Sequence, residues 1–208
     1  MEFIKRLFTN VTPLPEGTHH LQAVQDEKPY RLHLRLRSDG TGVLVVNAST
    51  VLHLNPTAAE YAYHFIQGTA PEQAAAEVAA RYRVDRKTAL ADYAGFTERI
   101  RTLLSTQDLD PVSFLDFERV APHSTAMSVP LRLDCALTYR LPLGSAAELA
   151  PVKRADHELT ADEWGVILDK ASKAGIPHVT FTGGEPTLRA DLPELISRAE
   201  KNEQVCGL

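Results

Sequence analysis

The residues best suited to chemistry in this sequence follow an apolar run, in the segment His-Val-Thr-Phe-Thr-Gly-Gly-Glu-Pro-Thr-Leu at positions 178–188. The run 179–181 is typical of a buried strand. After it, Gly183 and Gly184 let a ligand approach backbone groups that a Cβ would shield, and Glu185 can accept hydrogen bonds from an ammonium group. Pro186 then stops the strand, because it has no N–H to add to the sheet. The pattern predicts a strand that presents a polar binding loop to a ligand.

This loop resembles the Gly-Gly-Glu-Pro motif of radical S-adenosylmethionine (SAM) enzymes. The resemblance implies that Gly183, Gly184, Glu185 and Pro186 hold the amino group of the methionine part of SAM. It also implies a partial barrel of strand–helix units and a [4Fe-4S] cluster. In that family, three cysteines spaced C-x3-C-x2-C hold the cluster and leave the fourth iron for SAM.

The cysteines for such a cluster are too few, because the chain contains only Cys135 and Cys206. The segment 131–140 resembles the family's first strand, and that register fills the three cysteine positions with Leu141, Ser145 and Glu148. A second register begins at Cys135 and meets Tyr139 and Pro142. At most one thiolate survives in either register, and iron–sulfur clusters strongly favour thiolates. We therefore expect no metal ligand and no catalytic residue, and we interpret the SAM-binding motif as vestigial.

The remainder of the carboxyl-terminal segment alternates strands with helices. We expect strands at 131–138, 178–182 and 205–208, a helix opened by Thr160 with Glu163 in capping-box spacing, and a helix at 191–201. This order predicts parallel units with right-handed crossovers, an incomplete radical SAM-type barrel that stops at its third strand. Such a sheet leaves an edge strand bare. The segment is then a fragment, is covered by a partner, or is a decayed remnant.

The amino-terminal half has a different order, with strands first and helices afterwards. Residues 31–37 and 43–47 predict a hairpin, a third strand follows at 51–54, and Asn55 and Pro56 open a helix to about residue 67. The spacing of Thr69 and Glu72 predicts a capping box for a second helix. Asp85 is the expected N-cap of a third helix, which runs to about residue 104.

With the Leu-Asn-Pro-Thr-Ala corner at 54–58, this order resembles the PqqD-like domain, a winged helix-turn-helix also called the RiPP recognition element. That family binds the leader segment of a ribosomally made peptide. The resemblance implies β-augmentation, in which the leader adds a strand to the edge of the sheet and faces the third helix. The implied peptide-binding residues are Val51, Leu52, His53, Leu54, Leu90 and Tyr93.

We expect four parts in the chain. They are a loosely structured arm at 1–29, a PqqD-like domain at 30–105, a linker at 106–130 with apolar anchors at Phe114, Leu115 and Phe117, and a partial radical SAM domain at 131–208. The fold class is therefore α+β followed by α/β.

The composition excludes several classes of protein. With 44% hydrophobic and 24% charged residues, the 208-residue chain is typical of a globular protein. No apolar run reaches 18 residues and the start is too charged for a signal peptide, so we expect a cytoplasmic protein that does not bind a membrane. The net charge of −5 argues against nucleic acid as a partner.

Three functions follow from these observations. The first is a leader-peptide-binding accessory or degenerate member of the radical SAM peptide-maturase family, whose partners are the leader peptide and a complete radical SAM enzyme. The second is a fragment or variant of an active enzyme that binds SAM and a 4Fe-4S cluster and modifies a ribosomal peptide. The third is a winged-helix regulator that binds DNA.

Overall fold

The computed structural model describes residues 11–106, 108–115, 129–144, 150–152 and 156–208. The chain divides into two compact units, 1–119 and 120–208, and the division falls within the expected linker. The short helix α5, Pro111–Leu115, also lies there. Of the expected apolar anchors, Leu115 is buried and Phe114 packs against the core of the first unit, whereas Phe117 lies outside the described residues.

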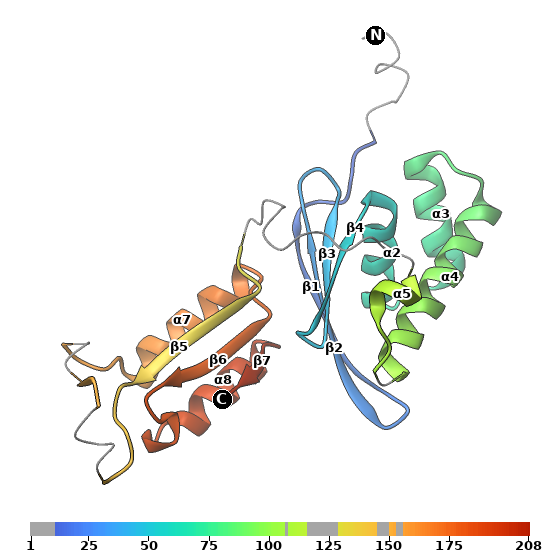
Figure 1. Ribbon diagram of the computed structural model, residues 1–208. Coiled ribbons are helices and arrows are strands. Elements are labelled where there is room, and N and C mark those ends of the chain that lie inside the picture. The colour runs from blue at the N-terminus through green and yellow to red at the C-terminus, as the bar shows by residue number, and fades with distance from the viewer. Residues whose placement is uncertain (1–10, 107, 116–128, 145–149, 153–155) are drawn as a thin grey trace. The chain divides into compact units, whose positions relative to one another are not determined.

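The first unit is an antiparallel sheet followed by helices (Figure 1). The strands, in the order β1-β2-β3-β4, are Gly17–Gln25, Lys28–Leu36, Gly42–Val46 and Thr50–Leu54. The helices that follow are α2 at Pro56–Ile66, α3 at Pro71–Tyr82 and α4 at Arg86–Ser105. The expected hairpin, the strand after it and the three helices are therefore present, with one strand more than expected.

The additional strand corrects the prediction of a loosely structured arm at 1–29. Strand β1 pairs with β2 along all nine of its residues and forms a long hairpin (Figure 1). The two turn residues, Asp26 and Glu27, have φ angles of 49° and 64°, the left-handed conformation that two-residue hairpin turns require. This turn was not predicted, because it lacks the glycine or asparagine that marks most such turns.

Three expected helix starts have different outcomes. The side chains of Asn55 and Asp85 accept hydrogen bonds from the backbone N–H groups of Ala58 and Thr88, as N-caps do. The prediction of a capping box at Thr69 is wrong, because Thr69 is not the N-cap of this helix. Helix α3 is instead preceded by Ala70 and begins at Pro71, whose fixed φ suits the first helical position, and Thr69 Oγ1 lies 3.2 Å from His64 Nδ1.

Alternate residues of the sheet build the core of the first unit. They point toward the helices and pack against α2 and α4, and they include Leu32, Leu34, Leu36, Leu44, Val46, Leu52 and Leu54. A separate apolar cluster joins the three helices to one another through Tyr61, Ala74, Ala75, Val78, Ala89 and Tyr93. Strand β4 is thus fixed from the helix side, and its outer edge is one end of the sheet.

The second unit is a parallel sheet with its helices on one face, as the alternation of elements predicts. In chain order its elements are β5 at Arg132–Thr138, α7 at Ala161–Lys173, β6 at His178–Gly183, the 3-10 helix η2 at Pro186–Leu188, α8 at Leu192–Lys201 and β7 at Val205–Gly207. The capping box of Thr160 and Glu163 is confirmed. The core between strands and helices contains Cys135, Leu137, Leu168, Val179, Phe181, Leu192, Leu195 and Ala199. Among the described residues, no helix is long and apolar enough to cross a membrane.

A buried ion pair fastens α3 to α2 in the first unit. The side chain of Glu60 is 1% exposed, and its carboxylate lies 2.8 Å from Nε of Arg81 and 3.7 Å from Nε2 of His64. Arg81 also donates to the carbonyl of Thr12, 2.9 Å away. Burial alone would raise the pKa of Glu60, but hydrogen bonds from His64 and Arg81 outweigh it and lower the pKa.

We expect Arg81→Met to lower the free energy of unfolding by roughly 3 kcal/mol, because it leaves the carboxylate of Glu60 buried without its cation. Urea unfolding followed by circular dichroism measures this change. The matched control is Arg86→Met, since Arg86 donates only to the exposed carbonyl of Glu72 and its loss should cost under about 0.5 kcal/mol. Equal effects of the two variants would contradict the assignment.

The ion pair of Glu60 and Arg81 also predicts that the free energy of unfolding depends on pH. Because the pKa of Glu60 is lowered on folding, its stabilisation is fully present above the ordinary value of 4.5 and is lost as the pH falls through the lower folded value. Glu60→Gln should therefore flatten the acid side of the curve of unfolding free energy against pH.

Candidate functional site

The candidate site begins where β6 ends, at two glycines pressed against the end of β5. Gly183 has a φ of +117°, and a Cβ on it would lie 2.1 Å from the carbonyl oxygen of Thr138. A Cβ on Gly184 would lie equally close, 2.1 Å, to the carbonyl oxygen of Arg140. No side chain fits at either position without moving backbone, so this approach requires both glycines.

Backbone hydrogen bonds hold this approach in place. The N–H of Gly184 donates to the carbonyl of Thr138 at 2.6 Å, and the N–H of Glu185 donates to the carbonyl of Arg140 at 2.8 Å. The sequence predicted that the glycines open their backbone to a ligand, whereas in the structure the chain itself fills that space. The glycines therefore position the loop, and the charged side chain that follows them is that of Glu185.

Glu185 is fixed by the residues that follow it. Its Oε1 accepts hydrogen bonds from the backbone N–H of Thr187 at 3.0 Å and from Thr187 Oγ1 at 2.6 Å, so it caps η2, which opens at Pro186. The hydroxyl and backbone N–H of Thr187 lower the pKa of Glu185. The carboxylate is thus charged at neutral pH, and its Oε2 is not used by these two bonds. A fixed, half-buried carboxylate suits an ammonium group.

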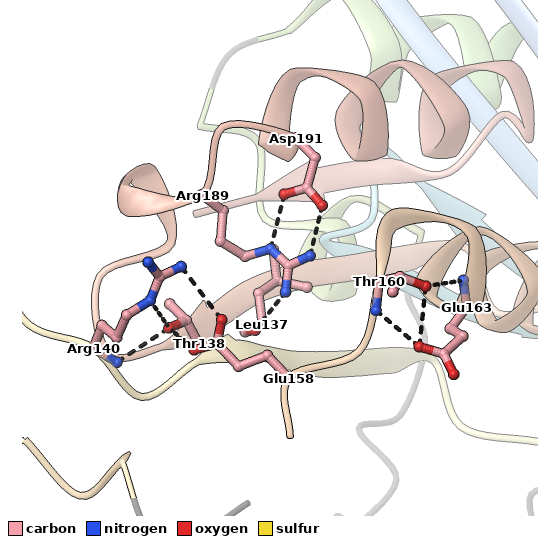
Figure 2. A network of polar contacts seen from close by, with 8 residues as sticks. All are labelled: Leu137, Thr138, Arg140, Glu158, Thr160, Glu163, Arg189 and Asp191. Carbon is pink, nitrogen blue, oxygen red and sulfur yellow. Dashed lines mark hydrogen bonds and ion pairs between the residues drawn. The ribbon is translucent and has the colours of Figure 1, made fainter. Parts of the chain in front are cut away.

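A second polar network connects the residues at the end of β5 with Glu158, which lies shortly before α7 (Figure 2). Thr138 Oγ1 donates to Glu158 Oε1 and accepts from the backbone N–H of Arg140 at 3.1 Å and from its Nε at 3.2 Å. Arg140 Nη2 lies 3.3 Å from Glu158 Oε2. A salt bridge and a threonine therefore join the end of β5 to the residues before α7. The resemblance places the cluster cysteines within that stretch of sequence.

The described residues of this chain offer no set of ligands for a [4Fe-4S] cluster. Cys135 is 1% exposed within the strand–helix core, and burial raises the pKa of its thiol to about 11, which disfavours the thiolate that binds iron. Cys206 packs against the same core. Leu141 offers no donor, and Ser145 and Glu148 lie outside the described residues. Among the described residues, no group of three or more histidine, cysteine or acidic side chains could hold a metal ion.

The residues expected to bind a peptide are divided between two places. Strand β4 forms the end of its sheet, where Val51 and His53 are exposed and Leu52 and Leu54 are buried in the core. The strand can therefore offer its backbone and two side chains. Leu90 and Tyr93 instead belong to the cluster between the helices. The structure does not bring all six residues into one cluster.

Tyr93 also lines a groove of about 650 Å³ along α4 that the sequence did not predict. Its other wall comes from the β1–β2 hairpin, including Leu21 and Tyr30. The side chain of Gln25 bridges to the carbonyl of Arg101 there, at 3.1 Å. The groove could have been predicted only with the turn at residues 26–27, because that turn places β1 beside β2 and so forms one wall.

Comparison with known proteins finds relatives over part of the chain. It is 42% identical over 81 residues to a PqqA peptide cyclase of Granulibacter bethesdensis and 37% identical over 84 residues to one of Bradyrhizobium diazoefficiens. These segments are 38% and 39% of this chain, and each covers 22% of the relative. The chain thus aligns with about a fifth of the length of these relatives. No protein-family model matches the chain.

Solved structures of SuiB from Streptococcus suis are also similar. The structure bound to precursor peptide SuiA shares 16% identity with a TM-score of 0.46 and covers 89% of this chain and 42% of SuiB. The structure bound to S-adenosylmethionine shares 18% identity with a TM-score of 0.46 and covers 84% of this chain and 39% of SuiB. Both TM-scores are below 0.5, so this likeness does not establish a shared fold.

We expect Gly184→Ala to destabilise the second unit by roughly 3 kcal/mol, because its Cβ would collide with the carbonyl of Arg140. The fluorescence of Trp164, the only tryptophan in the chain, follows urea unfolding of this unit. Gly165→Ala in α7 is the matched control. Its Cβ would meet the side chain of Arg198 at an ordinary 3.6 Å, and helix propensity predicts a gain of up to about 1 kcal/mol. A neutral Gly184→Ala would contradict the role given to the close approach.

Proposed function

We propose that this chain is a peptide-recognition protein related to radical SAM peptide maturases, which binds a leader peptide through its first unit and lacks a usable cluster site. The observation that carries the proposal is the combination of 36–42% identity to PqqA peptide cyclases with only two cysteines, of which Cys135 is buried in the core and Cys206 packs against it. The relatives are named for acting on a peptide. The missing thiolates leave recognition as the capability that this chain can retain.

Peptide binding would use the outer edge of β4. In the described part of the chain β4 pairs only with β3, so its outer backbone groups are available for a further strand. The side chains of Leu52 and Leu54 hold β4 on the core, which fixes the edge before a peptide arrives. Val51 and His53 would lie beside alternate side chains of the added strand.

The second unit would offer a binding loop for the amino group of SAM. Gly183, Gly184 and Pro186 would set the course of the loop, and Glu185 would accept hydrogen bonds from the ammonium group. When bound beside an iron–sulfur cluster, SAM supplies radical chemistry, but the donors present here do not support such a cluster. A complete radical SAM enzyme would then be the partner that receives the leader peptide.

Two rival functions make different demands. An active radical SAM enzyme needs a cluster site that these residues do not provide. A winged-helix regulator needs a positive surface, whereas the chain has a net charge of −5. Duplex DNA binding that weakens steeply with salt would favour the regulator.

The test is titration of the full chain with leader peptides encoded near its gene. We expect the amides of β4 to become protected from hydrogen exchange, because the peptide pairs with that strand. Val51→Asp should weaken binding roughly two- to fivefold by removing an apolar cross-strand neighbour. Val24→Asp is the matched control, because Val24 is an exposed valine on β1 at the other end of the sheet.

An absence of binding at hundreds of micromolar peptide would contradict peptide recognition. Protection confined to β1 and α4, with Val51→Asp binding as well as the wild-type chain, would contradict the β4 edge and assign the peptide to the groove along α4 instead.

A further inference from the structure

A bulge in β5 leaves one residue of that strand outside the ladder. Ala136 pairs with Thr182 and Thr138 pairs with Gly183, and the register shifts between them, so Leu137 has no partner on β6. The side chain of Leu137 is buried in the core. Its carbonyl needs a donor from elsewhere, since an unsatisfied buried carbonyl is costly.

Arg189 supplies that donor from beyond the Gly-Gly-Glu-Pro loop. Its Nη1 donates to the carbonyl of Leu137 at 2.9 Å, across 52 residues of sequence. Figure 2 shows the guanidinium between Leu137 and Asp191. Nε and Nη2 donate to the two carboxylate oxygens of Asp191 at 2.9 and 2.6 Å. The Arg189 side chain is only 6% exposed, so this paired carboxylate offsets the cost of burying the charge.

Asp191 connects this pair to the helix that follows. It directly precedes α8, and its backbone carbonyl accepts from the N–H of Leu195 at 3.2 Å. The guanidinium of Arg189 lowers the pKa of Asp191, so the carboxylate stays charged. The guanidinium therefore joins the bulge in β5 to the start of α8.

The loop is consequently attached to β5 at both of its ends. At the near end, the N–H groups of Gly184 and Glu185 donate to the carbonyls of Thr138 and Arg140. At the far end, Arg189 donates to the carbonyl of Leu137. Glu185 and its Thr187 contact lie between these attachments, so movement at the far end would displace the carboxylate.

We propose that Arg189 is a positioning residue, which holds the loop on the bulge of β5 and thereby presents the Glu185 carboxylate to a ligand bearing an ammonium group. This inference rests on the proposed ligand role of the loop. Arg189 does not itself contact the ligand. Its three nitrogens donate separately to the carbonyl of Leu137 and to both carboxylate oxygens of Asp191, a geometry that the single nitrogen of a lysine cannot reproduce.

The test compares Arg189→Lys with a matched variant in the full chain. Arg198→Lys is the control, because Arg198 makes a similar two-point pair with Asp169 at 3.0 and 2.5 Å, between α7 and α8 and away from the loop. Hydrogen exchange of the amides of Gly184, Glu185 and Thr187 reports the loop directly. We expect about tenfold faster exchange in Arg189→Lys, from loss of the charge-assisted fork, and no change in Arg198→Lys.

Binding of SAM to the same variants, measured by calorimetry, tests the consequence for the ligand. We expect about tenfold weaker binding in Arg189→Lys, near-complete loss in Glu185→Gln, and unchanged binding in Arg198→Lys. Asp191→Asn keeps the shape of the partner and removes its charge, so it should also weaken SAM binding. It replaces Arg189→Lys in the test if that variant does not fold.

The outcomes separate the two claims. If the wild-type chain does not bind millimolar SAM, the ligand role of the loop is wrong, while exchange at Gly184 and Glu185 still tests whether Arg189 holds the loop. If SAM binds and neither exchange nor affinity changes in Arg189→Lys and Asp191→Asn, the positioning role of Arg189 is wrong.

Discussion

The second unit depends on the contact of two backbones, where the end of β6 lies directly against the residues that follow β5. Because Gly183 and Gly184 have no Cβ, the carbonyls of Thr138 and Arg140 come close enough to accept hydrogen bonds from the loop. The loop therefore leaves the sheet in one direction, and Glu185 becomes the cap of η2. The two glycines were expected to open the backbone to a ligand, and in the structure they allow the loop to pack against the residues after β5. In our proposal, the ligand is bound by the Glu185 carboxylate that this contact orients.

The residues after β5 support the proposal that this chain recognises a peptide without holding a cluster. On either side of the stretch where the family resemblance places thiolates, Arg140 and Glu158 are joined to each other and to Thr138. Its cysteines belong to the apolar core, where burial opposes the thiolate form. In the first unit, by contrast, Leu52 and Leu54 hold β4 on the core, and no strand of the described residues pairs with its outer edge. Such an edge is suited to pairing with an extended peptide.

Local patterns predicted much of this architecture from the sequence. Alternating apolar residues gave β2 to β4, and side chains able to accept from free N–H groups marked the starts of α2, α4 and α7. The β1–β2 hairpin was missed because Asp26 and Glu27 both adopt positive φ without the glycine that marks most such turns. The attachment of Arg189 to Leu137 could not be predicted, because it depends on a bulge and on residues 52 positions apart. The sequence likewise could not show that the glycines face the backbone of β5.

We propose above all that the two cysteines of this chain cannot hold a four-iron cluster. The most direct measurement is anaerobic reconstitution of the purified full chain with iron and sulfide, followed by removal of unbound metal, iron and sulfide counting, and visible absorption. We expect the protein to be colourless and free of stoichiometric iron. Brown protein that retains iron and sulfide in the proportion of one [4Fe-4S] cluster per chain would contradict it.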